Sequence, residues 1–287
     1  MPDLAPTPAY EIDDHVWTEL LAPSYPIIHL SNNHGTAAVA LHGAHVISYT
    51  PTHQKPVIFT SQQAIYREGT AIRGGIPICW PWFNAHPSDQ SLPSHGHARN
   101  QFWQVIGSKH TQDLTSVTLE INHNKLKASV TISLGASLET SLTTTNISEK
   151  TQTIGGALHS YLSISDIEKI SIAGLEDTYY VDTLTETEEL QEGEISIHEE
   201  VDRIYINTSD TVSIYDPEWN RTIFVDKNGS QSTVIWNPWI EKSNNMADLG
   251  DDEYREFVCI EAANARDDVY NLEPGVSHTL STTITSV

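Results

Sequence analysis

Residues 66–103 concentrate side chains that bind oxygen-rich ligands. The segment holds three arginines, three histidines, three tryptophans and four prolines, and it contains no repeat. Arginine presents a planar fork of N–H donors, and a histidine ring nitrogen can donate or accept a hydrogen bond. If residues 93–99 run extended, side chains alternate and His95, His97 and Arg99 share one face. We therefore predict that this face holds an oxygen-rich ligand such as an anion.

Arg73 stands next to a pair of glycines in the same segment. Gly74 and Gly75 carry no side chain and can adopt positive φ, so they predict that the chain passes close to another backbone here. Such a passage would hold Arg73 in a fixed, crowded position. Arg73 is thus a fourth candidate for contact with the ligand.

His159 and Glu261 are candidates for proton transfer. On a strand, His159 would share a face with Ala157 and Tyr161, although an isolated strand histidine is more often structural. Glu261 ends the apolar run 257–261, so we expect its carboxylate to be partly buried. Burial raises the pKa of a carboxyl group toward the neutral range, where histidine also titrates. Together the two residues would form an acid/base pair.

These residues lie in blocks that resemble, in the same order, the hexose-6-phosphate mutarotases (glucose-6-phosphate 1-epimerases) of the aldose 1-epimerase superfamily. The four blocks are residues 66–103, Ala157–Tyr161, Val234–Lys242 and Cys259–Asn264. The resemblance implies an isomerase that interconverts the α and β anomers of glucose 6-phosphate or a related hexose 6-phosphate. It implies acid/base ring opening and closure with no cofactor and no metal.

The resemblance also implies roles for individual residues. Glu261 would be the base at the anomeric hydroxyl, and His159 would be the acid at the ring oxygen. Four residues would surround the sugar, with the arginines at the phosphate: Arg73, His95, Arg99 and Asp202. Ser94 stands where some relatives have glutamine, so we expect a shorter hydrogen-bond donor at the sugar, and the preferred hexose stays open.

Five residues have equally plain structural interpretations. Asp202 alone would be a surface residue or a turn cap. Trp236 and Trp239 could offer a flat wall to a pyranose ring, but tryptophans beside prolines more often fill a core. His42 and His45, in an early glycine-containing turn, are interpreted as structural.

Other functions remain as alternatives. The protein could be a mutarotase of free aldoses, or a non-catalytic carbohydrate-binding or sugar-phosphate-binding protein. A glycoside hydrolase generally needs two carboxylates at the bond that breaks, and Glu261 alone stands out. His95 and His97 could form half of a metal site, but no cluster of further ligands at zinc spacing accompanies them.

Alternation of apolar and polar residues dominates the rest of the chain. Residues 117–134 predict an antiparallel hairpin that turns at residues 122–125. Further strands are predicted at residues 27–30, 37–41, 137–146, 153–164, 203–206, 212–215, 222–225, 232–236, 257–261 and 278–285. The pattern predicts an all-β fold, a large antiparallel β-sandwich with few short helices, as a single domain over residues 1–287. The resemblance implies a galactose-mutarotase-like super-sandwich.

The first 25 residues are rich in proline and weakly patterned. We expect an irregular arm there, with a short helix at residues 16–21. The N-terminus lacks a signal peptide pattern, and no run of eighteen apolar residues follows. We therefore expect a cytoplasmic protein, and we expect it to be monomeric.

The net charge of −23 argues against binding to nucleic acid or to an anionic membrane. The charge is uneven, because residues 60–135 carry six basic and four acidic side chains, whereas residues 166–202 carry thirteen acidic side chains and one lysine. With a screening length of about 8 Å at physiological salt, a local arginine pocket can still attract a phosphate. We predict that the acidic stretch is a solvated surface away from the arginines. Cys79 and Cys259 are predicted to be buried free thiols.

Overall fold

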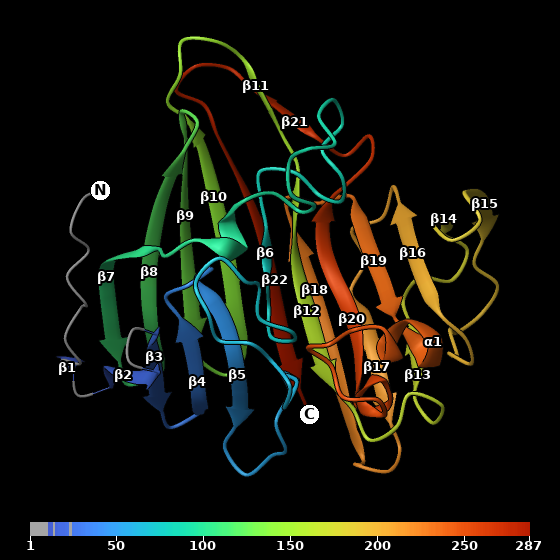
Figure 1. Ribbon diagram of the computed structural model, residues 1–287. Helices are drawn as coiled ribbons and strands as arrows, with labels where there is room; N and C mark the ends of the chain where they lie inside the picture. Colours follow the sequence, from blue (N-terminus) through green and yellow to red (C-terminus); the bar gives the residue numbers. More distant parts are fainter. Residues whose placement is uncertain (1–10, 14, 23–24) are drawn as a thin grey trace.

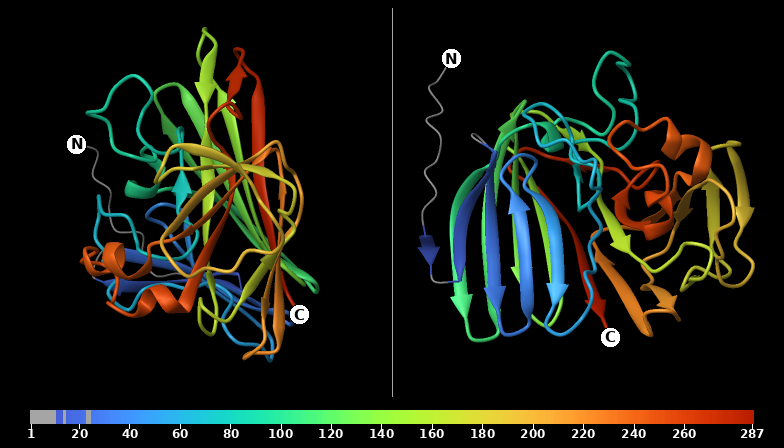
Figure 2. Two further views of the ribbon diagram at one scale, coloured as in Figure 1. Left: turned by 90° about the vertical axis from the view of Figure 1, so that its right-hand side faces the viewer. Right: turned by 60° about the horizontal axis from the view of Figure 1, so that its bottom comes forward.

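The structure is a computed structural model that describes residues 11–13, 15–22 and 25–287. Its strands form two layers (Figure 1). An eight-stranded antiparallel sheet makes one layer. A five-stranded sheet packs on one half of it, through β3 and β4 against β8 and β9, and a seven-stranded sheet packs on the other half, through β12 and β20 against β22. Figure 2 shows the same arrangement from two further sides. The predicted all-β antiparallel sandwich is confirmed.

The eight-stranded sheet has the spatial order β13 (Ser171–Ala173), β17 (Val212–Asp216), β18 (Arg221–Asn228), β22 (Ser277–Ser286), β10 (Leu138–Asn146), β9 (Leu126–Leu134), β8 (Leu114–His123) and β7 (Gln104–Thr111). The seven-stranded sheet has the order β15 (Thr187–Leu190), β14 (Tyr179–Asp182), β16 (Val201–Ile206), β19 (Ser232–Asn237), β20 (Phe257–Asn264), β12 (Gly156–Ser163) and β6 (Ile78–Cys79). The five-stranded sheet has the order β1 (Glu11–Asp13), β2 (Val16–Ala22), β3 (Tyr25–Asn32), β4 (Gly35–Ala40) and β5 (His45–Pro51).

The remaining elements are short. A separate pair joins β11 (Gln152–Ile154) to β21 (Tyr270–Leu272), and the helical segments are α1 (Trp239–Asn244), η1 (Ala98–Asn100) and η2 (Glu253–Glu256). In the part of the chain that the structure describes, no helix has the length and apolar character needed to cross a bilayer. Both cysteines are buried and free, as the sequence predicted.

The main core lies between the two layers, and strand alternation decides which side chains enter it. In β9 every second residue is buried, and β9 pairs with β8 as the predicted hairpin. In β12 and β20 the main core receives Leu158, Leu162, Val258 and Ile260. The opposite face of these two strands belongs to a smaller cluster that includes Ala157, Tyr161, Cys259 and Ala263. His159 and Glu261 have the strand parity of this second, outer face.

The short helix predicted at residues 16–21 is wrong. This segment is β2, which pairs with β3 so that Val16 lies opposite Leu30. Val16 is fully buried and Trp17 is 38% exposed, which is the alternation of a strand. Pairing with a neighbouring strand outweighs the helix propensity of the leucines that follow. Residues 1–10 of the predicted arm lie outside the described residues.

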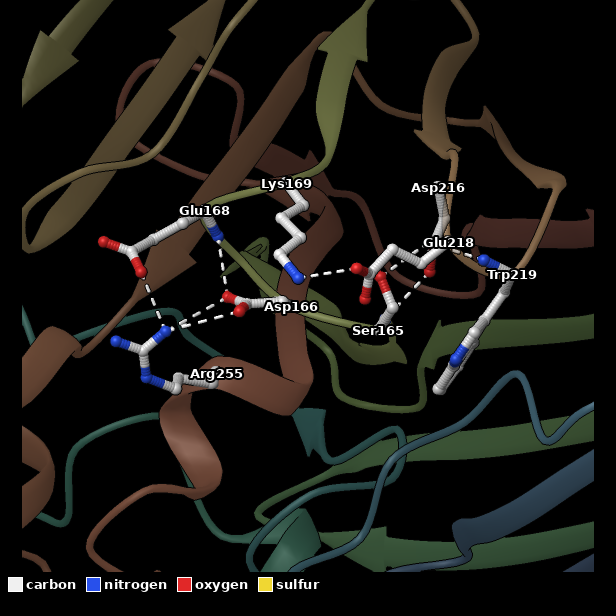
Figure 3. Close-up of polar contacts among 8 residues, drawn as sticks. All are labelled: Ser165, Asp166, Glu168, Lys169, Asp216, Glu218, Trp219 and Arg255. Carbon is white, nitrogen blue, oxygen red and sulfur yellow. Dashed lines mark hydrogen bonds and ion pairs between the residues drawn. The ribbon is translucent and has the colours of Figure 1, made fainter.

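A polar network outside the cavity joins the segment after β12 to η2 and to the end of β17 (Figure 3). Arg255 of η2 contacts Asp166 and Glu168 at 3.3 and 2.8 Å. The fully buried Asp216 accepts hydrogen bonds from the backbone N and the hydroxyl of Ser165, at 2.8 and 2.6 Å. The segment after β12 is therefore tied both to the end of β17 and to η2, which precedes β20.

Candidate active site

A cavity of about 340 Å³ opens on the outer face of the seven-stranded sheet. Strands β12, β16, β19 and β20 form its floor, and the segments around residues 71–77 and 83–99 contribute its walls. Seven of the residues predicted from the sequence to form the site line this one cavity: Arg73, Ser94, His95, Arg99, His159, Asp202 and Glu261. Residues far apart in the chain thus meet at one place.

His159 and Glu261 lie directly opposite each other on the neighbouring strands β12 and β20. The distance from His159 Nε2 to Glu261 Oε1 is 3.2 Å, and the side chains are 12% and 1% exposed. His159 Nδ1 and Glu261 Oε2 are buried and have no hydrogen-bond partner among the described residues. Because buried polar atoms are almost always paired, these open positions mark the pair as a candidate for contact with a ligand.

Burial shifts the pKa values of Glu261 and His159 in opposite directions. Burial raises the pKa of Glu261 well above the usual range of a carboxyl group, and the nearby Asp202 carboxylate adds to this shift. Burial lowers the pKa of His159 well below that of an ordinary histidine, and His95 lowers it further. Both shifts favour an uncharged pair at this buried position, with one proton on the carboxyl group. The short contact between the two side chains lets this proton pass from one to the other.

Arg73 enters the cavity from the predicted glycine pair. Gly74 and Gly75 have φ of 98° and 72°. A Cβ on Gly75 would lie 2.2 Å from a backbone carbonyl oxygen of β5, so the structure has the close backbone passage that the sequence predicted. Arg73 Nε donates to Asp248 Oδ1 at 3.2 Å, and Nη1 donates to the Tyr161 hydroxyl at 3.0 Å. Burial alone would lower the pKa of Arg73, but these two contacts raise it, so the side chain stays cationic.

His42 and His45 support this passage from behind. His45 is fully buried, and its Nε2 donates to the Gly74 carbonyl oxygen at 2.7 Å. Burial lowers the pKa of His45 to about 3, so the ring is neutral. The backbone N of Gly69 donates to His42 Nε2 at 3.0 Å. Both histidines are structural, as their sequence context indicated.

His95 is held as a neutral donor. The backbone N of Asn84 donates to His95 Nδ1 at 3.2 Å. Burial, followed by the positive charges of Arg99 and Arg73, lowers the pKa of His95 to about 3. A neutral imidazole whose Nδ1 accepts a hydrogen bond carries its proton on Nε2. His95 can therefore donate to a ligand hydroxyl or phosphate oxygen.

The predicted extended conformation of residues 93–99 is wrong. His95 and Gly96 have φ of 64° and 73°, and η1 begins directly afterwards, so the period-two alternation is broken. Gly96 makes this turn possible, because a Cβ there would lie 1.9 Å from a backbone carbonyl oxygen. His97 consequently leaves the cavity, and its ring centroid lies 4.2 Å from that of a histidine at the end of β8. Arg99 still reaches the cavity, where its Nη2 donates to the carbonyl oxygen of residue 94 at 3.0 Å.

The acidic stretch reaches the cavity at its C-terminal end. Asp202 lies on β16 opposite Trp236, and burial raises the pKa of its carboxyl group. Glu200 Oε1 lies 2.6 Å from the Nζ atom of Lys242, which also lines the cavity. The prediction that residues 166–202 lie away from the arginines is therefore wrong for these last residues. The stretch also contains strands β13, β14 and β15, which its sequence did not indicate.

Sequence reasoning missed three residues near the cavity. Tyr161 could have been found, because it lies two positions after His159 and a strand turns both to one face. Lys242 lies inside one of the blocks that carried the family resemblance. Asp248 follows α1 in a loop, and no local signal in the sequence links it to Arg73.

Trp236 and Trp239 lie in different parts of the structure. Trp236 lines the cavity and also packs in the smaller outer cluster, with its ring centroid 5.8 Å from that of His159. Trp239 packs against the main core and lies 5.3 Å from the ring of Tyr254. Trp236 therefore serves both as packing and as cavity wall, whereas Trp239 is a core residue.

A larger cavity, of about 620 Å³, lies on the other side of Phe83 and Asn84. These two residues line both cavities and separate them. The larger cavity contains neither His159 nor Glu261, so the smaller one is the candidate active site.

Comparison with known proteins gives consistent results. The family model described as aldose 1-epimerase matches residues 26–285. A protein of Escherichia coli K12 named "Putative glucose-6-phosphate 1-epimerase" is 34% identical over 240 residues, which is 80% of each chain. A protein of Cenchrus ciliaris with the same name is 34% identical over 259 residues, which is 83% of this chain and 78% of that one. The crystal structure of a "putative mutarotase (YeaD)" from Salmonella typhimurium superposes with a TM-score of 0.90 at 27% identity, over 98% of this chain and 96% of that one.

Proposed function

The chain belongs to the aldose 1-epimerase family and is an isomerase that acts on a carbohydrate, and we propose that it interconverts the α and β anomers of a hexose 6-phosphate. The observation that carries the proposal is one cavity that joins a buried proton-transfer pair to three cationic side chains. The pair is His159 and Glu261, and the cations are Arg73, Arg99 and Lys242.

The reaction needs two proton transfers. In ring opening, Glu261 accepts the proton of the anomeric hydroxyl while His159 donates a proton to the ring oxygen. The bond between C1 and the ring oxygen breaks, and C1 becomes an aldehyde carbon. Rotation about the C1–C2 bond then presents the opposite face of the carbonyl. In closure the sugar hydroxyl returns its proton to His159, and Glu261 returns its proton to the new anomeric oxygen.

The pair starts this cycle with one proton. Ring opening uses an ionised Glu261 and a protonated His159, whereas burial by itself favours the uncharged form. Both forms contain the same single proton, which moves across the 3.2 Å contact. A sugar that donates its anomeric hydroxyl to the carboxylate and accepts at its ring oxygen stabilises the charged form. Activity therefore requires one shared proton, and its pH limits are properties of the pair.

The cations support a phosphorylated substrate. Arg73 and Arg99 offer guanidinium groups, which match phosphate oxygens with paired N–H donors. Lys242 adds a point charge, and the neutral His95 adds a directed N–H. In a chain with a net charge of −23, this local gathering of cations favours an anionic ligand.

The test is NMR exchange spectroscopy on glucose 6-phosphate and on free glucose, with and without the protein and with no metal or nucleotide added. We expect faster anomer exchange for glucose 6-phosphate and a much smaller effect on glucose. Equal acceleration of both sugars would identify a mutarotase of free aldoses. Binding of the phosphate without any acceleration would identify a sugar-phosphate-binding protein.

A further inference from the structure

The guanidinium group of Arg73 is held from two directions, although the residue lines a cavity. Asp248 accepts from Nε at 3.2 Å, and the Tyr161 hydroxyl accepts from Nη1 at 3.0 Å. The Arg73 and Asp248 side chains are only 24% and 19% exposed. A guanidinium group has five N–H donors. Three of them, on Nη1 and Nη2, have no partner among the described residues and are available as a planar fork.

The loop between α1 and η2, which carries the aspartate, is fastened to the segment that carries Arg73. Glu253 is buried and accepts hydrogen bonds from the backbone N of Gly250 at 2.8 Å and of Gln62 at 2.9 Å. It also accepts from the Ser61 hydroxyl at 2.5 Å. The backbone N of Ser61 in turn donates to the carbonyl oxygen of Arg73 at 3.1 Å. One buried carboxylate thus sets the distance between the loop and the arginine backbone.

From this geometry we propose that Asp248 is a positioning residue, which orients the free N–H fork of Arg73 toward the phosphate of the substrate. The inference rests on the proposed function. An unconstrained arginine side chain would lose its rotamer freedom when the phosphate binds, and Asp248 removes that freedom in advance. The negative charge of Asp248 acts in the other direction on affinity, because a carboxylate beside the guanidinium group weakens its attraction for the phosphate. Directed hydrogen bonds to phosphate depend on orientation, so the positioning effect dominates.

Two substitutions separate the two effects. Asp248→Asn keeps an oxygen that accepts from Nε but removes the charge, whereas Asp248→Ala removes both. If Asp248 positions Arg73, Asp248→Ala should raise KM for glucose 6-phosphate about 10-fold or more. Misplacing a group that holds the substrate by about 1 Å can lower the efficiency of an enzyme by up to about 100-fold. Positioning also predicts that kcat changes less than about threefold, and that Asp248→Asn stays within about threefold of the natural protein in KM. Both parameters come from anomer-exchange rates at several substrate concentrations.

The outcomes distinguish this inference from the proposed function. If Asp248→Ala leaves KM unchanged or lowers it, or if Asp248→Asn raises KM as much as Asp248→Ala, Asp248 does not position Arg73. In an Arg73→Ala background, adding Asp248→Ala should have no further effect on KM, and an added effect would also overturn the inference. If Arg73→Ala alone leaves KM unchanged, the phosphate role of Arg73 fails together with the inference.

The matched control is another aspartate that pairs with an arginine outside the cavity. Asp166 contacts Arg255 at 3.3 Å (Figure 3), and we expect Asp166→Ala to leave KM for glucose 6-phosphate unchanged. A rise equal to that of Asp248→Ala would show a general effect of losing an ion pair and would overturn the inference. Asp248→Ser also lacks a carboxylate, carries the same expectation as the alanine variant, and replaces it if that variant does not fold.

Discussion

The two ends of the cavity are built in opposite ways. At one end His159 and Glu261 are buried, and each has a polar atom without a partner among the described residues. At the other end two of the three cations are paired with carboxylates: Arg73 contacts Asp248, and Lys242 contacts a glutamate that precedes β16. The buried Nε of Arg99 has no partner among the described residues. Both ends line the same cavity, yet His159 and Glu261 each have an open buried atom, whereas Arg73 and Lys242 are each held by a carboxylate.

This difference follows from what each end does in the proposed reaction. A proton-transfer group needs a free position for the substrate and a pKa shifted by burial. A buried polar atom without a partner costs about 1 to 3 kcal/mol, so this end destabilises the fold. A binding group instead gains from being fixed before the ligand arrives. Substitutions at the first end should therefore change rate and stability, and substitutions at the second should change affinity.

The largest effect is expected at the proton-transfer end. Glu261→Gln keeps the shape of the side chain but cannot accept a proton, and His159→Asn loses the acid. Each should lower kcat about 10²- to 10⁴-fold while binding of hexose 6-phosphate persists. NMR exchange measures the rate, and calorimetry measures the binding. Near-normal activity in either variant would remove that residue from the mechanism, and Asp202 or His95 respectively would replace it as the candidate.

The double variant sharpens this result. Because Glu261 and His159 act in the same step on one shared proton, the double variant should be little worse than the poorer single variant. Multiplied losses in the double variant would mean that the two side chains act in separate steps.

At the cationic end the expected effect is on affinity. Arg73→Ala should raise KM for hexose 6-phosphate about 10- to 100-fold, because each charge-assisted hydrogen bond is worth about 1.5 to 3 kcal/mol. KM for a free hexose should change less than about threefold, since a neutral sugar makes no such bond. Arg266→Ala, in the larger neighbouring cavity, is the control and should alter neither value. Equal losses on the two substrates would favour the free-aldose mutarotase.

The same contrast explains what the sequence could predict. Alternation is a local property, so the pattern of β8, β9 and β12 indicated both the strands and the shared face of His159 and Tyr161. Which residue of β20 lies opposite His159 depends on strand register, which single-strand patterns do not contain. The sequence named Glu261 and His159 as an acid/base pair from their residue types and expected burial, and the family resemblance gave each its role at the sugar.

The cationic end of the cavity was less predictable, because the carboxylates that contact Arg73 and Lys242 lie in loops far away in the sequence. Asp248 lies 175 residues from Arg73 in the chain, and no periodic pattern connects them. The turn at His95 depends on positive φ at two successive residues, and an assumed extended chain turned His97 the wrong way. Long-range contacts, and not local propensity, shape this end of the cavity.

A smaller effect is expected at Lys242, whose side chain is 41% exposed and is paired with Glu200. Lys242→Met should raise KM for hexose 6-phosphate about three- to tenfold, and Glu200→Gln should lower it about twofold by releasing the ammonium group, since exposed charges contribute modestly. Both effects should shrink as salt rises. Lys169, which contacts Glu218 at 2.5 Å on the outer edge, supplies the control variant Lys169→Met. A change in KM in that control would mean that total charge, and not the cavity, sets the affinity.

The smallest expected effect is on stability, and it tests the open end directly. Burial raises the pKa of Glu261, so the unfolded chain ionises this residue at a lower pH than the folded protein does. Glu261 therefore costs the folded state no free energy below its pKa in the unfolded chain, about 4.3. Above that pH the free energy of unfolding falls until the pH reaches the higher pKa of the folded protein. The Glu261→Gln variant cannot ionise at this position. Its melting temperature should be about 2 to 6 °C higher than that of the natural protein at pH 7 to 8, and the difference should disappear near pH 4.

Asp216→Asn is the opposite case. Asp216 accepts hydrogen bonds from Ser165 and Trp219, so its substitution should lower the melting temperature. Calorimetric melting across pH measures both, and a Glu261→Gln variant no more stable than the natural protein at pH 8 would mean that the open carboxyl group carries no cost to the fold.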